Sequence, residues 1–360
     1  MISYDSQILV GKRTIGLHHP TYFIADIASN HDSCLTRAKE LIWAAKEAGA
    51  DAAKFQHFKA KSLVSSAGFE QLDISAKHQD QWAKSVYEIY EENEYDRAWD
   101  EELALECKKA DIHFMTSPYD LEAIDSVEPL VAAYKVGSGD ITTPEILDKI
   151  SRKQQPIFLA SGASSMEDVD RAVDQVLENT PRIALMQCNT NYTGSLENFH
   201  HINLRVLTTF AKKWPNMVLG LSDHTPGHST VLAAVALGAR CVEKHFTDNN
   251  NRVGPDHAFS MTPVTWSEMV KRTREVEASL GDGIKKVQEN EAETVIVQRR
   301  GLHIERNMIA GESIKSSDLI SLRPAIPEGF FPYERNEAVG RVLMVSKKKG
   351  EPLKRSDICR

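Results

Sequence analysis

Residues 217–246 read MVLGLSDHTPGHSTVLAAVALGARCVEKHF and show the organisation of the chain most clearly. Two apolar runs rich in strand-forming residues, 217–223 and 241–246, flank a helical stretch at 227–237. The first run leads into His224 and the second contains His245 near its end. A strand, a helix and a second strand in this order are typical of an α/β fold with parallel strands.

The same alternation extends through most of the sequence. The expected strands are residues 22–28, 52–58, 112–117, 132–138, 156–161, 183–189, 217–223 and 241–246. The expected helices are 33–48, 98–110, 120–129, 143–152, 166–178, 197–213, 227–237 and 263–280. Eight strands alternating with eight helices predict a TIM (β/α)8 barrel. A doubly wound open sheet is the alternative, but the GxGxxG motif common after its first strand is absent.

Three further segments complete the predicted organisation. Residues 59–95 are too long for a simple connection and are expected to cover the barrel mouth or a partner subunit. A charged stretch after Gly283 separates the barrel from a region of short strands with Gly and Pro turns. We therefore predict a barrel domain at 1–283, a linker at 284–298 and a small β-rich domain at 299–360.

Composition restricts the classes of function. With 41% apolar residues and no apolar run near the ~20 residues that span a bilayer, the chain is expected to be soluble. The first residues show no secretion signal, so we expect a cytoplasmic protein. A net charge of -8 disfavours a nucleic-acid partner. The five cysteines lack CxxC spacing and indicate neither a disulfide scaffold nor a thiolate zinc site.

Polar residues gather where the predicted strands end, which is where barrel enzymes carry their chemistry. These residues are Asp26, Asn30, His31, Lys54, Gln56, His57, Thr116, Ser117, Lys135, Ser138, Ser161, Asn189, Thr190, Asn191, Tyr192, Asp223, His224, Glu243, Lys244 and His245. A barrel that needed only stability would not require such a ring of polar groups.

His224 and His245 are candidate metal ligands, because the last two strands of a barrel are neighbours and their imidazoles can share one ion. Two strong protein ligands suit a divalent cation with open positions, Mn²⁺ first and Mg²⁺ or Co²⁺ as alternatives. The competing interpretation is that each histidine is only a hydrogen-bonded strand end.

Lys54 and Lys135 are candidate anion-binding residues, because an inward lysine is costly without a partner. Internal salt bridges with Asp26 or Glu243 are the alternative. Strand alternation sends Lys244 away from the face that carries Glu243 and His245. The Gly-rich turn in KVGSGD, residues 135–140, could cradle a phosphate or carboxylate with its backbone NH groups.

Nine motifs in order resemble the sialic acid synthase (N-acetylneuraminate synthase) family, and the resemblance covers nearly the whole chain. They are IADIASNHDS, GADAAKFQHF, TSPYD, YKVGSGD, LASGAS, QCNTNY, GLSDHTPG, EKHFT and GPDH. The tail, with AGESI, LRPAIPEG and VGRVL, resembles that family's antifreeze-like SAF domain.

The resemblance implies condensation of phosphoenolpyruvate with the open-chain aldehyde of an N-acylated hexose such as N-acetylmannosamine. The products would be a nonulosonic, sialic-acid-like 2-keto-3-deoxy acid and phosphate, as in polysaccharide biosynthesis. It further implies a domain-swapped homodimer in which Arg323 reaches the partner's sugar. Carried over by motif, the metal ligands are His224 and His245, the phosphoenolpyruvate-binding residues are Lys54, Thr116, Lys135, Ser138, Ser161 and Thr190, and the sugar-binding residues are Asp26, Gln56, Tyr192, Asp256 and Arg323.

The chain departs from the family pattern at the sugar site. The family usually has glutamate where this chain has Asp26, a catalytic carboxylate one methylene shorter. Some members have Asn at Thr190, and a proline often stands where this chain has Thr193. Two alternatives therefore stay open, an octulosonate-type synthase that also uses phosphoenolpyruvate and a catalytically silent barrel that binds a sugar acid.

Overall fold

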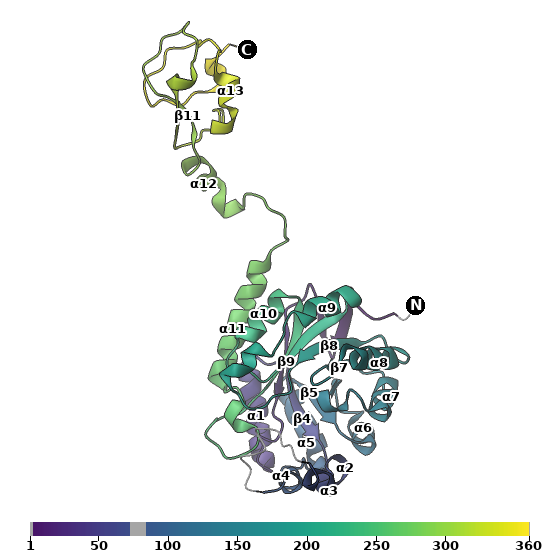
Figure 1. The fold of residues 1–360 in the computed structure, drawn as a ribbon. Helices are drawn as coiled ribbons and strands as arrows, with labels where there is room; N and C mark the ends of the chain where they lie inside the picture. The colour runs from purple at the N-terminus through teal and green to yellow at the C-terminus, as the bar shows by residue number, and fades with distance from the viewer. Residues whose placement is uncertain (1–2, 73–83, 360) are drawn as a thin grey trace. The chain divides into compact units, whose positions relative to one another are not determined.

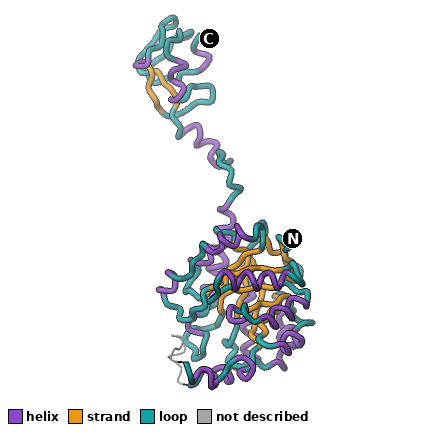
Figure 2. The backbone as a smooth tube through the Cα atoms, turned by 45° about the vertical axis from the view of Figure 1, so that its right-hand side comes forward, coloured by secondary structure: helices purple, strands orange, loops and turns teal. Residues whose placement is uncertain are grey.

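The computed structural model describes residues 3–72 and 84–359, which divide into two units, residues 1–281 and 282–360. The first unit is a closed barrel of eight parallel strands surrounded by helices, as the sequence predicts (Figures 1 and 2). Its strands are β3 (Tyr22–Asp26), β4 (Ala52–His57), β5 (His113–Pro118), β6 (Ala133–Val136), β7 (Ile157–Ala160), β8 (Ile183–Cys188), β9 (Val218–Asp223) and β10 (Ala239–His245). The pairing of β10 with β3 closes the barrel.

Helices follow the strands in the expected alternation. They are α1 (Leu35–Glu47), α5 (Asp100–Lys109), α6 (Leu121–Val127), α7 (Pro144–Arg152), α8 (Met166–Leu177), α9 (Val206–Lys213), α10 (Ser229–Ala236) and α11 (Pro263–Leu280). The single helix predicted at 197–213 is wrong, because a 3₁₀ turn at Leu196–His200 and a left-handed Asn203 precede α9. None of the helices in the described ranges is long and apolar enough to cross a membrane.

A hairpin that the sequence did not predict closes the amino end of the barrel. Strands β1 (Gln7–Val10) and β2 (Arg13–Gly16) pair antiparallel before the barrel begins. Their buried side chains Ile8, Val10 and Ile15 pack against residues at the strand starts, including Tyr22 and Phe158. This apolar floor leaves the opposite, carboxyl end as the place for polar side chains.

The long segment after β4 forms three short helices, α2 (Ala60–Leu63), α3 (Ser66–Glu70) and α4 (Val86–Glu92), which gather at one end of the barrel in Figure 1. Residues from α2 and α4 line a cavity together with His245 and Asp256. The prediction that this segment covers the barrel mouth is confirmed for these residues, and its central part, 73–83, lies outside the described residues.

The second unit has its own small core. Strands β11 (Gly301–Ile304) and β12 (Leu319–Leu322) pair antiparallel, and Leu302, Ile304 and Phe330 are among its buried apolar residues. The unit also contains α13 (Arg335–Ala338). The predicted linker 284–298 holds one further helix, α12 (Ala292–Val297), and the division between the units falls after Gly281 rather than Gly283.

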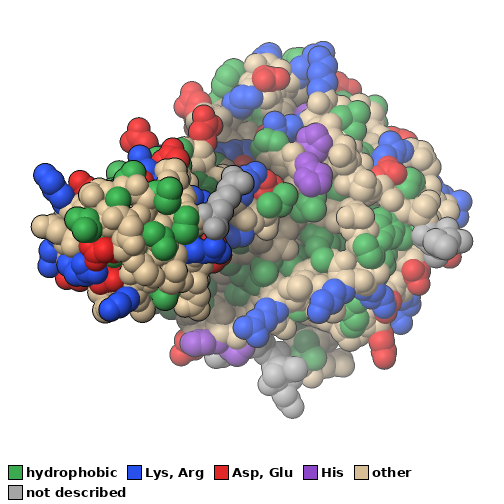
Figure 3. All heavy atoms as spheres, turned by 90° about the horizontal axis from the view of Figure 1, so that it is seen from above, with side chains coloured by type: hydrophobic (Ala, Val, Ile, Leu, Met, Phe, Trp, Pro, Cys, Tyr) green, Lys and Arg blue, Asp and Glu red, His purple; other side chains and the backbone are tan. Residues whose placement is uncertain are grey.

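Charged side chains are scattered over the surface without a continuous basic patch on the face shown in Figure 3. Lysine and arginine stand there among aspartate and glutamate.

Candidate active site

Strand alternation sorts the polar residues into those that face the barrel interior and those that face the helices. Ala52 and Met115 belong to the inner apolar cluster, whereas Phe55 belongs to the outer one between strands and helices. Positions two residues further along each strand face the same side. Asp26, Lys54, Ser117, Lys135, Ser222, Glu243 and His245 therefore project inward near the carboxyl end.

Two lysines and two carboxylates alternate inside this end of the barrel. Lys54 Nζ lies 2.8 Å from Asp26 Oδ2 and 3.9 Å from Glu243 Oε2, while Lys135 Nζ lies 2.6 Å from Glu243 Oε1. All four residues are at most 4% exposed. The structure thus shows the internal salt bridges that the sequence left as an alternative, and their charges balance one another.

The pKa values of Asp26 and Lys135 are shifted by their oppositely charged neighbours. Burial by itself would raise the pKa of the Asp26 carboxyl, but Lys54 and His245 lower it to about 2. Burial likewise acts to lower the pKa of Lys135, and the Glu243 carboxylate reverses this and raises it. Asp26 and Lys135 are therefore charged at neutral pH.

Glu243 Oε2 has no hydrogen-bond partner among the described residues, although the atom is buried. The other oxygen, Oε1, accepts from Lys135 and from Ser222 Oγ at 3.1 Å. Glu243 Oε2 can therefore still accept a hydrogen bond from a ligand or a water molecule.

Lys244 faces the other way, as strand alternation predicts. Its ammonium donates to Asp223 Oδ2 and to the carbonyl of Thr225, both buried on the outer side of the strands. Lys244 is therefore excluded from the interior network.

The two candidate metal ligands stand side by side, with ring centroids 5.5 Å apart. His224 Nδ1 donates to the carbonyl of Asn189 at 2.9 Å, which fixes the tautomer that leaves Nε2 without a proton. His245 Nδ1 is buried without a hydrogen-bond partner among the described residues. His245 Nε2 lies 3.6 Å from Asp26 Oδ2, and Nδ1 lies 3.9 Å from Asp256 Oδ2.

The simple strand-end interpretation accounts for one nitrogen of His224 but leaves a nitrogen of His245 unexplained. Within residues 3–72 and 84–359, no group of three or more His, Cys, Asp or Glu is arranged to hold a metal ion. The two imidazoles thus fit a cation that keeps most of its coordination positions for water or substrate.

A small polar cradle lies next to the lysines at the ends of β6, β7 and β8. Gly162 N donates to Ser138 Oγ at 3.2 Å, and the buried Thr190 Oγ1 lacks a hydrogen-bond partner among the described residues. A Cβ at Gly162 would stand 2.4 Å from Thr190 Oγ1, 2.7 Å from Ser138 Oγ and 3.0 Å from Cys188 Sγ. The sequence analysis missed Gly162 and Cys188, although both lie within quoted motifs.

The hydroxyls of two predicted phosphoenolpyruvate-binding residues make other hydrogen bonds. Thr116 faces outward, where its hydroxyl contacts His57 Nδ1 and the carbonyl of Phe55. Its neighbour Ser117 faces inward, with Oγ 3.2 Å from Lys54 Nζ. Ser161 Oγ donates to Gln187 Oε1 at 3.2 Å. The structure therefore brings Ser117, not Thr116, to the lysines and engages Ser161 with Gln187.

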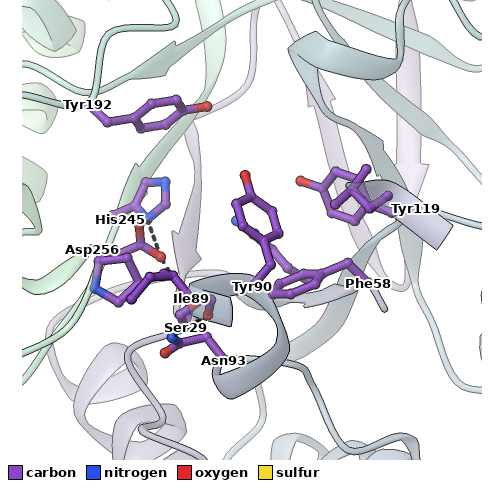
Figure 4. Close-up of a pocket in the computed structure, with 12 residues that line it drawn as sticks. Ser29, Phe58, Ile89, Tyr90, Asn93, Tyr119, Tyr192, His245 and Asp256 are labelled. Carbon is purple, nitrogen blue, oxygen red and sulfur yellow. Dashed lines mark hydrogen bonds and ion pairs between the residues drawn. The ribbon is translucent and has the colours of Figure 1, made fainter. Parts of the chain in front are cut away.

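The predicted sugar-binding residues Gln56, Tyr192 and Asp256 line one cavity with His245 (Figure 4). Gln56 Nε2 donates to Asp26 Oδ2 at 3.1 Å, which joins the cavity to the charged network. The Tyr192 ring packs 4.4 Å from the His224 ring. Arg323 belongs to the second unit, where it is exposed.

Comparison with known proteins gives consistent matches over both units. A family model described as the NeuB family matches residues 41–285, and a SAF domain model matches residues 299–358. An N,N'-diacetyllegionaminic acid synthase of Campylobacter jejuni is 32% identical and aligns over 92% of this chain and 98% of its own. The human N-acetylneuraminate-9-phosphate synthase is 31% identical over 93% and 91% of the two chains.

A solved structure is similar in fold. The spore coat polysaccharide biosynthesis protein SpsE of Bacillus subtilis has a TM-score of 0.64 and 27% identity, covering 98% of this chain and 99% of its own. A pseudaminic acid synthase of Helicobacter pylori is 28% identical over 94% of this chain and 98% of its own. The names of the legionaminic acid, pseudaminic acid and N-acetylneuraminate-9-phosphate synthases refer to different sugar acids.

Proposed function

The chain belongs to the NeuB family, and on that premise we propose that it condenses phosphoenolpyruvate with the open-chain aldehyde of an N-acylated hexose. The products are a nine-carbon 2-keto-3-deoxy acid and inorganic phosphate. The names of the relatives support this class of reaction. The observation that carries the proposal is the pair of buried lysines, Lys54 and Lys135, in a network that reaches the cavity through the contact of Gln56 with Asp26.

Phosphoenolpyruvate binds at the lysines in this proposal. Its phosphate and carboxylate join Asp26 and Glu243 as partners of the two ammonium groups. The hydroxyls of Ser138 and Thr190 lie at the cradle, where they can donate to phosphate oxygens. Fixing both anionic groups orients C3 of the enol toward the cavity.

The residues present fit a divalent cation, with Mn²⁺ the first choice. His224 and His245 would hold it through the His224 nitrogen left unprotonated and the unpartnered nitrogen of His245. When bound, such an ion supplies Lewis-acid polarisation of the aldehyde oxygen. Asp26 would keep its negative charge beside His245 and hold Gln56 in position.

The bond changes follow from these positions. C3 of phosphoenolpyruvate attacks the aldehyde carbon, and the aldehyde oxygen becomes a hydroxyl. Water then adds to C2, losing a proton, and the tetrahedral intermediate expels phosphate with the bridging oxygen. Asp26, 2% exposed and bonded to Lys54 and Gln56, is the carboxylate placed to orient that water.

The proposal is tested by phosphate release from phosphoenolpyruvate with a panel of N-acylated hexoses, with Mn²⁺ or with chelator. We expect release that requires both substrates and falls at least ~100-fold in Lys54→Met, since the anion loses a cation contact. A mass equal to sugar plus pyruvate identifies the product. Absence of release with every sugar, in a protein that binds phosphoenolpyruvate, would instead favour a silent binding barrel.

We also propose a homodimer in which Arg323 serves the sugar site of the partner subunit. Arg323 is exposed within its own unit and is available for such a contact. The variant Arg323→Ala should raise the KM for the sugar at least ~10-fold at unchanged KM for phosphoenolpyruvate. An unchanged sugar KM would refute this role and leave the condensation itself unaffected.

A further inference from the structure

We infer that the acceptor is an unphosphorylated sugar with an apolar substituent at the end remote from its aldehyde, and that Phe58, Leu63, Ile89 and Tyr90 recognise this substituent. These four residues are called the apolar wall below. The inference rests on the proposed function, since the direction of the sugar is set by where the aldehyde reacts. It adds a substrate class that the names of the relatives leave undecided.

The apolar wall is built by the segment that follows β4. Phe58 stands just after the strand, Leu63 ends α2, and Ile89 and Tyr90 lie on α4. Phe58 is 5% exposed, and its ring packs 5.4 Å from Tyr90 and 6.2 Å from Tyr119. Packed aromatic rings hold the shape of the wall before a ligand arrives.

The candidate metal ligand His245 and the carboxylate of Asp256 lie on the other side of the cavity. Figure 4 shows His245 and Asp256 across the cavity from Phe58 and Tyr90. Gln56 connects the polar side to Asp26 and hence to the lysines. A sugar whose aldehyde meets the enol near His245 therefore directs its far carbons toward the apolar wall.

The charge of the lining argues against a phosphate at that far end. Among the described residues, the twelve that line the cavity include no lysine or arginine, and one of them, Asp256, is a carboxylate. The nearest basic residue in sequence, Lys59, already pairs with Glu94 Oε2 at 2.9 Å. A phosphate dianion moved from water to this wall would lose hydration, and none of the described residues that line the cavity would supply a cation.

An apolar group at the same place would gain contact. A deoxy carbon in place of a hydroxymethyl, or the methyl of a second N-acyl group, would bury apolar surface against Phe58, Leu63 and Ile89. Discrimination of a single methyl-sized group by an apolar pocket is typically ~10-fold or more. The structure thus distinguishes three acceptors, an N-acetylhexosamine, its 6-phosphate, and a 6-deoxyhexose with two N-acetyl groups.

The test measures kcat/KM for these three acceptors at saturating phosphoenolpyruvate. We expect the diacetylated 6-deoxy sugar to exceed the N-acetylhexosamine at least ~10-fold, and the 6-phosphate to be the poorest. Ile89→Lys places a cation in the apolar wall and should raise the ratio of 6-phosphate to 6-deoxy turnover at least ~10-fold. Leu63→Lys serves as the second variant if Ile89→Lys does not fold.

The matched control is Leu105→Lys, which adds the same charge at a 52%-exposed leucine of α5 outside the cavity lining and should leave the ratio unchanged. Best turnover with the 6-phosphate in the unmodified protein, or an unaltered ratio in both wall variants, would overturn the inference. Failure of all three acceptors with phosphoenolpyruvate would count against the proposed reaction instead, so the two outcomes are distinguishable.

Discussion

Replacing Lys135 by methionine tests whether the buried network is held together by charge. The substitution keeps most of the volume and leaves Glu243, which is 4% exposed, without its nearest cation. At an effective permittivity of ~20, the attraction across 2.6 Å is about 6 kcal/mol before desolvation is subtracted. Breaking a buried ion pair from one side costs ~3–5 kcal/mol in typical cases.

The lower end of that range is expected here. Lys54 Nζ remains 3.9 Å from the other oxygen of Glu243 and still attracts it by about 4 kcal/mol on the same gross scale. We therefore predict that Lys135→Met lowers the free energy of unfolding of the barrel by about 3 kcal/mol. Adding Glu243→Gln removes the uncompensated charge and should restore about 2 kcal/mol of this loss.

Urea unfolding followed by tryptophan fluorescence suits the measurement, because all five tryptophans fall within residues 1–281. The double variant should regain stability yet bind phosphoenolpyruvate at least ~10-fold more weakly, since the anion has lost a lysine. Additive effects of the two substitutions, with a coupling energy under ~0.5 kcal/mol, would refute the reasoning.

Three other perturbations give clear expectations. The Asp26 carboxyl, whose pKa is lowered to about 2, binds protons more weakly when folded, so its stability contribution is lost as pH falls below 4. Between pH 6 and pH 3, the free energy of unfolding measured in urea should fall by about 1 kcal/mol more in the wild type than in Asp26→Asn. An equal dependence of this free energy on pH in the two proteins would contradict the prediction. Gly162→Ala crowds Thr190 and should weaken phosphoenolpyruvate binding in calorimetry at least ~10-fold, and unchanged binding would contradict the role of the cradle. Chelation of divalent cations should abolish turnover, while the affinity for phosphoenolpyruvate measured by calorimetry changes less than ~3-fold. Equal turnover with and without chelator would show that the reaction does not need the cation.

The barrel could be predicted from sequence because its strands are short apolar runs at regular spacing, as in 217–223 and 241–246. The hairpin β1–β2 was missed because each strand has only four residues and its partner surface, the barrel floor, exists only after folding. The predicted helix 197–213 was too long because the apolar pattern does not reveal the left-handed residue Asn203.

The polar side chains that face the barrel interior could be predicted, because side chains alternate between the two faces along each strand. Because Met115 faces inward, the same period also places Ser117 inward and Thr116 outward, which the resemblance by motif did not reveal. The apolar wall could not be foreseen, because Ile89 and Tyr90 reach the cavity through a segment without strand or barrel-helix spacing. Pairing of each lysine with a particular carboxylate likewise depends on barrel closure between β10 and β3.

The most direct test of the proposed condensation follows the bridging oxygen of phosphoenolpyruvate labelled with ¹⁸O, with mass spectrometry of both products. Attack of water at C2 and loss of phosphate from C2 predict that the label leaves entirely with inorganic phosphate. The second product should then have the mass of sugar plus pyruvate. Label retained in an organic product, with unlabelled phosphate or a phosphorylated sugar beside it, would mean phosphorus–oxygen cleavage and contradict the condensation.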